Sequence, residues 1–261
     1  MPEAAVNGVR LHYEVHGEGA PIACIHGGGS SAVMWEDAIV ELAQRGRVIS
    51  YDRRGCSRSE RPEPYATSVV QQADDAAALL AQVAGEAAVV IARSYGGAIA
   101  LDLALRYPGR VRALVLLEGD ALGLSPVGLE WTRGLRQRLL GIAEERGMAA
   151  VYEALIDEVM GPGIWDSFPG EVQAILTANG PALLAELAYV DEPMPGAAEL
   201  ATIGVPTLLV AAEDSPAEQR EMSEAMAAVI PDAQLTHVEG GHLVNPASPP
   251  VLAFIDEVVS G

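Results

Sequence analysis

The stretch that decides the fold reads Ala88-Val89-Val90-Ile91-Ala92-Arg93-Ser94-Tyr95-Gly96-Gly97, followed directly by Ala98-Ile99-Ala100-Leu101. An apolar, β-branched run stops at Ala92, and two glycines then open an alanine- and leucine-rich run typical of a helix. The pattern predicts a strand, a sharp turn and a helix, with Ser94 at the turn. Small residues are needed on both sides, where backbone passes close to backbone, and Ala92 and Gly96 supply them.

Ser94 is a candidate nucleophile because of this position. The strand holds its hydroxyl clear of the sheet edge, and the new helix directs its N-terminal N–H groups toward the same point. The alternative is a serine that only caps an ordinary buried helix. The rest of the chain bears on the choice.

Strand and helix patterns alternate nearly throughout, which predicts an α/β fold with a mostly parallel central sheet and helices on both faces. The start differs, because Asn7-Gly8 joins two short strand patterns into a hairpin. The later strands are expected at residues 21–25, 47–51, 88–92, 111–117, 206–212 and 233–238.

Residues 121–202 lack strand signals, and their helical pieces are broken by glycine and proline. We interpret this segment as a helical cap inserted after the strand that ends near Leu117. The core then comprises residues 1–120 and 203–261. Such a cap is expected to cover an apolar pocket, with Trp131 and Trp165 against the substrate, although both can also belong to the cap's own core.

Composition narrows the functional classes. The 261 residues suit one medium domain with a sizeable core, and no apolar run reaches the length of a membrane span. The N-terminus lacks the pattern of a secretion signal, so we expect a soluble cytoplasmic protein. A formal charge of -20 argues against binding to nucleic acid or anionic membranes. A small-molecule substrate is expected, and the oligomeric state stays open.

Several chemistries are disfavoured by what the chain lacks. Every basic residue is arginine, which excludes Schiff-base chemistry, a pyridoxal phosphate anchor and a serine–lysine dyad. Cys24 and Cys56 suggest neither a disulfide framework nor a metal cluster. The histidines lack metal-ligand spacing, and no dinucleotide fingerprint follows the first parallel strand. We therefore expect no cofactor and no metal.

A base for Ser94 is available in His242. Serine is a poor nucleophile until a base takes its proton and a third group orients that base. His242 lies in Glu239-Gly240-Gly241-His242-Leu243, on the loop after the last strand pattern, which reaches the same sheet edge as Ser94. Among the other histidines, His26 begins a glycine loop and is expected to brace it by hydrogen bonding.

That loop contains Gly27-Gly28-Gly29, and three successive glycines lose much backbone entropy on folding. Their presence therefore calls for a structural or functional explanation. No lysine follows it as a phosphate-binding loop requires. The functional interpretation is an oxyanion hole, with one N–H from Gly28 and another from Tyr95, just after the serine. Gly29 is then expected beside the substrate. The alternative is a flexible turn.

Together these motifs resemble the α/β-hydrolase superfamily over nearly the whole chain. The matching pieces include Ser94-Tyr95-Gly96-Gly97, Gly241-His242 and, on two loops, His26-Gly27-Gly28-Gly29 and Asp52-Arg53-Arg54-Gly55-Cys56-Ser57-Arg58-Ser59. The last piece is similar to loops of cofactor-free haloperoxidases (perhydrolases) and proline iminopeptidases. In the family, Asp52 and Arg54 usually hold loops in place. Arg93, directly before the serine, is unusual.

The triad acid has three candidates in the sequence. Family members commonly carry it on the loop after the strand ending at Ala212. Counted from Pro206, the usual aspartate position falls on Ser215, and Asp214 stands one place early. Other members use the end of the preceding strand, where Glu118 stands. We favour Asp214, with Glu118 as the alternative and Asp120 third.

The resemblance implies a serine hydrolase that cleaves a small or medium ester, lactone or related acyl compound through an acyl-enzyme. Alternatives on the same scaffold are perhydrolysis and carbon–carbon hydrolase or lyase chemistry. An alternative of another class is a non-catalytic small-molecule binding protein that keeps the fold.

Overall fold

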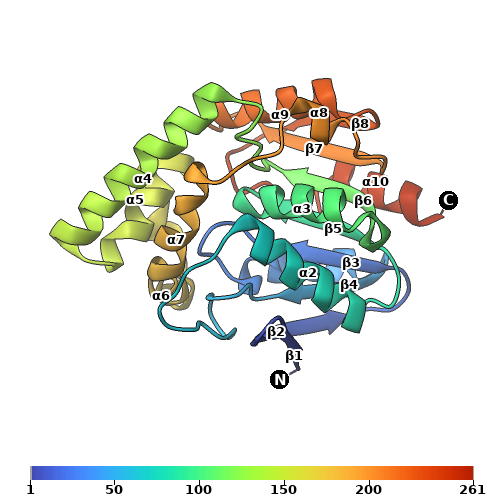
Figure 1. Cartoon of the computed structure of the whole chain (residues 1–261), viewed down its shortest axis with the longest axis horizontal. Coiled ribbons are helices and arrows are strands. Elements are labelled where there is room, and N and C mark those ends of the chain that lie inside the picture. Colours follow the sequence, from blue (N-terminus) through green and yellow to red (C-terminus); the bar gives the residue numbers. More distant parts are fainter. Residues whose placement is uncertain (1, 261) are drawn as a thin grey trace.

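The computed structural model describes residues 2–260 and has one eight-stranded sheet at its centre (Figure 1). The strand order is β1-β2-β4-β3-β5-β6-β7-β8, antiparallel from β1 to β4 and parallel from β4 to β8. The predicted mostly parallel sheet is therefore confirmed. Its strands are β1 Glu3–Val6, β2 Val9–His16, β3 Pro21–Ile25, β4 Arg47–Tyr51, β5 Ala88–Arg93, β6 Val111–Leu117, β7 Thr207–Ala212 and β8 Ala233–Val238.

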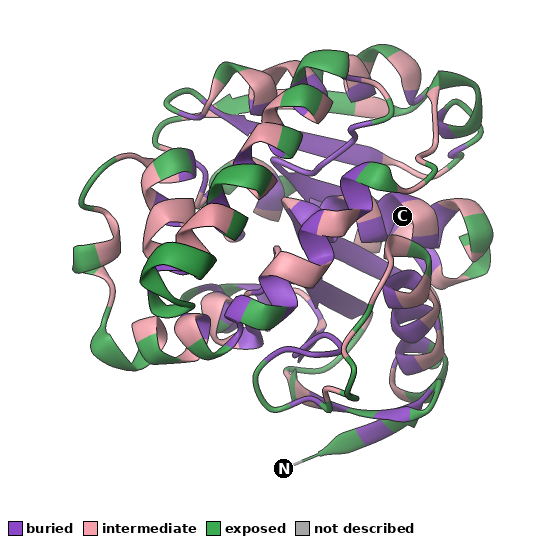
Figure 2. Ribbon diagram, turned by 60° about the vertical axis from the view of Figure 1, so that its left-hand side comes forward, coloured by how far each residue is buried: buried purple, intermediate pink, exposed green. Residues whose placement is uncertain are grey.

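Helices cover both faces of the sheet. On one face α2 (Val69–Val83), α3 (Tyr95–Arg106) and α9 (Ala217–Val229) contribute to the larger apolar core. On the other face α1 (Glu36–Leu42) and α10 (Pro249–Ser260) contribute to a second core. Strands β3 and β5 are buried along their whole length, as parallel strands covered on both faces are (Figure 2). Short 3₁₀ turns are η1 Ala32–Trp35 and η2 Pro108–Arg110.

The cap, residues 121–202, contains helices and no strand in the described structure. Four of its helices gather beside one end of the sheet (Figure 1) around a separate apolar cluster that includes Leu135, Val151 and Leu183. The division of the chain at these boundaries stays a prediction. The elements are α4 Pro126–Arg146, α5 Ala149–Met160, η3 Trp165–Ser167, α6 Gly170–Ala178, α7 Gly180–Glu186, η4 Leu187–Asp191 and α8 Ala197–Leu200.

The register of the parallel strands sets which loops meet. Arg93 of β5 pairs with Leu117 of β6, and Leu117 pairs with Val210 of β7. Ala212 at the end of β7 pairs with Val238 at the end of β8. The segments that follow these strands, among them Ser94, therefore emerge together at the carboxyl edge of the sheet.

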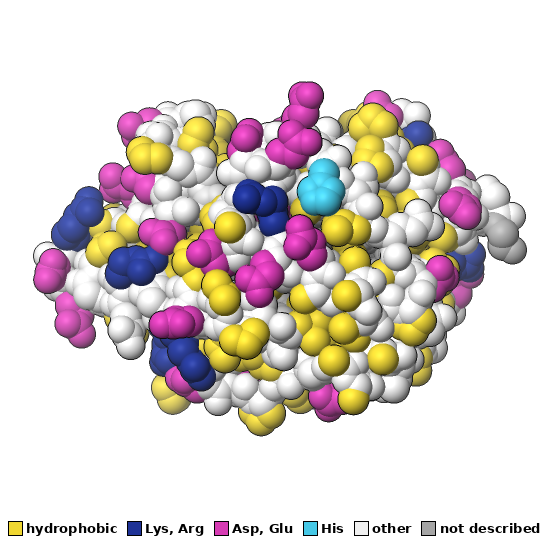
Figure 3. All heavy atoms as spheres, turned by 90° about the horizontal axis from the view of Figure 1, so that it is seen from above, with side chains coloured by type: hydrophobic (Ala, Val, Ile, Leu, Met, Phe, Trp, Pro, Cys, Tyr) yellow, Lys and Arg dark blue, Asp and Glu magenta, His cyan; other side chains and the backbone are white. Residues whose placement is uncertain are grey.

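The face of the molecule seen in Figure 3 carries side chains of both charges. In the view from above, acidic, basic and hydrophobic side chains are interspersed (Figure 3). Among the described residues, no helix combines the length and the apolar character that a membrane crossing requires.

Candidate functional site

Ser94 stands at a strained turn between β5 and α3. Its backbone has φ 50° and ψ −126°, which a residue with a side chain adopts only under constraint, and its side chain makes no capping hydrogen bond. The helix starts in tight contact with its neighbours. A Cβ on Gly96 would lie 2.6 Å from the Ile25 carbonyl oxygen, and one on Gly97 would lie 2.4 Å from the Gly119 Cα. This geometry does not fit a simple capping serine.

Glu118, the residue after β6, is also held at a positive φ of 49°. Its carboxylate is buried and has a partner at each oxygen. Oε1 accepts the Ala212 N–H at 2.7 Å, and Oε2 accepts the Ser215 hydroxyl at 2.6 Å. Burial alone would raise the pKa of Glu118, but hydrogen bonds, first of all from His242, lower it below the ordinary value. The side chain is therefore a fixed carboxylate.

His242 lies on the loop after β8 and is in direct contact with Glu118. Its Nδ1–H donates to Glu118 Oε2 at 2.7 Å. In the neutral ring, that bond holds the proton on Nδ1 and leaves Nε2 as the acceptor. His242 and Ser94 line the same cavity.

The structure corrects the preference for Asp214 as the partner of His242. Strand β7 continues to Ala212, and the turn after it leaves Asp214 exposed, with its N–H bonded to the Gly240 carbonyl. Ser215, at the position that counting from Pro206 indicates, turns inward and bonds Glu118. The alternative, Glu118, is the carboxylate beside His242.

Gly28 and Tyr95, the expected oxyanion donors, both line the cavity with Ser94. They are close neighbours, since a Cβ on Gly28 would lie 3.8 Å from the Tyr95 Cβ. Tyr95 is the first residue of α3, where N–H groups have no acceptor inside the helix. The Gly28 N–H has no acceptor among residues 2–260. Both donors are thus free to bind an oxyanion.

His26 braces the glycine loop (residues 26–30) as expected. Its Nε2 accepts the Arg53 N–H at 3.0 Å, so Nδ1 carries the proton and donates to the Gly27 carbonyl at 2.9 Å. Burial and the nearby Arg53 charge lower the pKa of His26 to about 3, which keeps the ring neutral. Asp52 and Arg54 also form loop contacts, Asp52 with Ser31 and Arg58, and Arg54 with Asp75.

The cavity holds about 900 Å³ of space outside the protein atoms, including its opening to solvent. Its cap-side lining is mostly apolar, which suits an uncharged substrate. That lining comprises Trp131, Thr132, Leu135, Tyr152, Leu155, Ile156, Val159, Met160, Phe168, Leu176, Leu183, Glu186, Leu187 and Tyr189.

Two of the three expected substrate contacts fall outside this lining. Trp131 lines the cavity, but Trp165 packs its ring against Tyr152 and Phe168 within the cap. Gly29 is also absent from the lining, and its N–H donates to Glu186 of the cap at 2.7 Å. Sequence alone could not show whether these tryptophans belong to the cavity wall or to the cap's own core.

Arg93, the unusual residue before the serine, is a buried cation held by a carbonyl and a ring. One guanidinium N–H donates to the Val244 carbonyl at 2.6 Å, and the group stacks over Trp35 at 4.9 Å from the ring centroid. Burial lowers the pKa of Arg93 to about 10. The side chain ties β5 to the segment just after His242.

Sequence reasoning missed three polar side chains of the cap that bond the glycine loop: Tyr152, Asn179 and Glu186. No local motif marks them. In the described part of the chain, no three His, Cys, Asp or Glu side chains are grouped as around a metal ion.

Known proteins resemble this chain over nearly its whole length. A model of the alpha/beta hydrolase family matches residues 22–254. The chain belongs to the alpha/beta hydrolase family. One relative, named a putative carbamate hydrolase RutD of Azorhizobium caulinodans, is 32% identical over an alignment of 275 positions that covers 99% of each chain.

Solved structures of the family are similar over nearly the full length. A thermophilic esterase from Thermogutta terrifontis is 26% identical with a TM-score of 0.79, over 99% of this chain and 96% of that one. Est816, described as an N-acyl homoserine lactone degrading enzyme, is 25% identical with a TM-score of 0.74, over 100% and 99%. This alpha/beta hydrolase is therefore an enzyme of the hydrolase class.

Proposed function

We propose that this alpha/beta hydrolase is a serine hydrolase that cleaves a small or medium uncharged ester, lactone or related acyl compound. The observation that carries the proposal is the buried Glu118–His242 pair, at 2.7 Å, at the sheet edge where Ser94 stands in a strained turn. A carboxylate behind an imidazole, with a serine on the other side, is the arrangement that makes a hydroxyl nucleophilic.

In the proposed mechanism, Ser94 attacks the carbonyl carbon while His242 Nε2 takes the hydroxyl proton. Glu118 keeps the ring oriented and stabilises its charged form. The N–H groups of Gly28 and Tyr95 bind the oxygen on which charge develops. His242 then gives the proton to the leaving group, and water releases the acyl group from Ser94 with His242 again as base.

The apolar lining supports an uncharged substrate, and the relatives suggest which leaving groups to try. One of them is named a putative carbamate hydrolase and another degrades an acyl homoserine lactone. Carbamates and lactones therefore belong in the substrate panel beside 4-nitrophenyl esters of increasing acyl length.

The test combines turnover on this panel with labelling by a fluorophosphonate probe, read by intact mass. We expect one probe per chain on Ser94, and no labelling or turnover in Ser94→Ala. Ester hydrolysis that persists in Ser94→Ala would overturn the covalent mechanism. A wild-type chain that neither turns over nor labels would favour the binding-protein alternative.

A further inference from the structure

Three cap side chains bond consecutive backbone groups of the glycine loop. The Tyr152 hydroxyl donates to the Gly28 carbonyl at 2.7 Å, the Asn179 amide donates to the Ser30 carbonyl at 2.9 Å, and Glu186 Oε2 accepts the Gly29 N–H at 2.7 Å. The proposed oxyanion loop belongs to the core in sequence but is supported from the cap.

The peptide group between Gly27 and Gly28 decides where the proposed oxyanion donor points. Arg53 Nη2–H donates to the Gly27 carbonyl at 2.7 Å, and Arg53 Nε–H donates to the His26 carbonyl at 3.1 Å. A trans peptide is planar, with its C=O and N–H opposed. Holding the Gly27 oxygen toward Arg53 therefore directs the Gly28 N–H away from Arg53.

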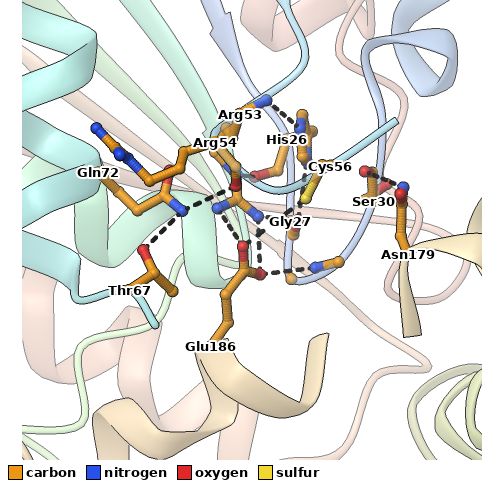
Figure 4. Close-up of polar contacts among 12 residues, drawn as sticks. His26, Gly27, Ser30, Arg53, Arg54, Cys56, Thr67, Gln72, Asn179 and Glu186 are labelled. Carbon is orange, nitrogen blue, oxygen red and sulfur yellow. Dashed lines mark hydrogen bonds and ion pairs between the residues drawn. The ribbon is translucent and has the colours of Figure 1, made fainter. Parts of the chain in front are cut away.

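Arg53 is itself fixed by Glu186 of α7 (Figure 4). The two side chains form a bidentate pair, with Nη1 at 2.7 Å from Oε1 and Nη2 at 3.0 Å from Oε2. Arg53 is 0% exposed and Glu186 is 2% exposed. Nη2 thus bonds Glu186 and the Gly27 carbonyl at once, which leaves the guanidinium one orientation.

The loop and α7 are also packed without space between them. Gly29 has φ +52°, and a Cβ there would lie 2.5 Å from the Leu183 Cβ. Any side chain at position 29 would push the loop off the helix. Contact and hydrogen bonding together make the loop's conformation depend on α7.

We propose that Glu186, acting through Arg53, is a positioning residue that orients the Gly28 N–H toward the oxyanion. This inference rests on the proposed function. It makes the cap part of the machinery that stabilises the transition state, rather than only a cover over the substrate.

The neighbouring Arg54 offers a matched control. Arg54 and Asp75 form a second bidentate pair, at 2.7 and 2.8 Å, that is 5% and 1% exposed. Among the described residues, their side chains bond none of residues 26–30. Asp75→Asn and Glu186→Gln each remove one buried carboxylate charge from an arginine, but only Glu186→Gln disturbs the glycine loop.

The experiment measures kcat and KM on the best 4-nitrophenyl ester, with the folded fraction checked by circular dichroism. We expect Glu186→Gln to lower kcat about 10- to 100-fold and to change KM less than threefold, since losing a whole oxyanion donor costs 10²–10³-fold. An aryl boronic acid, which mimics the tetrahedral state, should bind more weakly by a similar factor. Asp75→Asn should keep the wild-type kcat per folded molecule.

Arg53→Lys separates geometry from charge. Lysine keeps a cation for Glu186, but it lacks the planar guanidinium that donates to the His26 and Gly27 carbonyls at once. We expect Arg53→Lys to lose kcat as Glu186→Gln does, which also tests the inference if Glu186→Gln does not fold. Wild-type kcat in Arg53→Lys, equal losses in Glu186→Gln and Asp75→Asn, or a loss confined to KM would overturn the positioning role. The proposed function fails separately, if turnover does not depend on Ser94.

Discussion

The two walls of the cavity are built in different ways. On the core wall, Ser94 and His242 lie on the segments that follow β5 and β8, and Glu118, which follows β6, is buried behind His242. These strands belong to one hydrogen-bonded parallel ladder, so backbone pairing fixes where the segments emerge. The cap wall consists mainly of apolar side chains on α4 to α7, and their positions depend on how helices pack.

The polar groups of the two walls also point to different targets. Glu118 bonds the ring of His242, whereas Tyr152, Asn179 and Glu186 bond backbone of the glycine loop. The sheet edge therefore supplies the reacting groups, while the cap shapes the cavity and supports the backbone of the glycine loop. Changes on the core wall, and to the cap side chains that bond the glycine loop, should therefore act on kcat. Changes to the apolar cap lining should act on substrate binding.

The largest expected effect lies on the core wall. Glu118→Gln should lower kcat/KM by up to about 10⁴-fold, because an amide neither holds the right tautomer of His242 nor stabilises its charged form. Asp214→Asn is the control, since Asp214 is exposed, and its rate should stay within about twofold of wild type. Initial rates of both variants on one ester show which of the two carboxylates the reaction needs. A large loss in Asp214→Asn with none in Glu118→Gln would reverse the assignment.

Ser215→Ala should act more mildly on the same carboxylate. It removes a 2.6 Å hydrogen bond to Glu118 Oε2, and bonds to charged groups contribute about 1.5–3 kcal/mol. We expect kcat to fall about tenfold. Hydrogen bonds lower the pKa of Glu118, so it stays ionised below its ordinary range, and its contribution to stability is lost as pH falls through that lowered pKa.

Removing the Ser215 hydroxyl should bring the pKa of Glu118 closer to its unfolded value, so the variant gains less stability from the ionised carboxylate. The melting temperatures of wild type and Ser215→Ala, measured between about pH 3 and pH 7, should differ most near pH 7 and converge as the pH falls. A difference of the same size at every pH would mean that the hydroxyl does not stabilise the carboxylate form.

The core wall could be predicted from sequence to the extent that strands decide it. The apolar run before Ser94 and the strand before His242 locate both residues at one edge, because parallel strands end together. The choice between Asp214 and Glu118 could not be made, since it depends on one residue in a turn. Only coordinates show that Ser215 turns inward there.

The cap wall was far less predictable. Glu186 and Arg53 are 133 residues apart and lie in no recognisable motif, so their pairing depends on how α7 docks on the core. The contact of Trp165 with substrate stays a prediction, and the structure places its ring outside the cavity lining, against Tyr152 and Phe168. An apolar residue on a helix can face the cavity or the helix bundle, and only packing tells them apart.

The two tryptophans give a test on the cap side. Trp131→Ala should raise KM for long acyl esters about five- to tenfold with kcat nearly unchanged, because removing apolar contact area weakens binding alone. Trp165→Ala should lower the melting temperature without changing the chain-length preference, since it packs within the cap. KM values across the ester series and a melting curve separate the two. Equal shifts in chain-length preference in Trp131→Ala and Trp165→Ala would indicate that Trp165 also contacts the substrate.

The smallest effect is expected where the two walls meet. Asp120 follows β6, its N–H donates to the Ser94 carbonyl at 3.0 Å, and its carboxylate accepts the Tyr189 hydroxyl of the cap at 2.6 Å. Burial raises the pKa of Asp120, so between its unfolded and folded pKa values the native state binds more protons than the unfolded chain. Stability therefore falls as pH rises through that interval.

Asp120→Asn should remove that dependence while keeping an acceptor for Tyr189, and its kcat should stay within about twofold of wild type because His242 is paired with Glu118. The urea midpoint, measured from pH 4 to pH 8, should fall less with rising pH in the variant than in wild type. Parallel curves of urea midpoint against pH would show that the buried Asp120 carboxyl does not make stability depend on pH. A loss of kcat as large as that of Glu118→Gln would instead give Asp120 a share in orienting the base. That loss of kcat would weaken the division between a reactive core wall and a supporting cap, because Asp120 bonds groups of both.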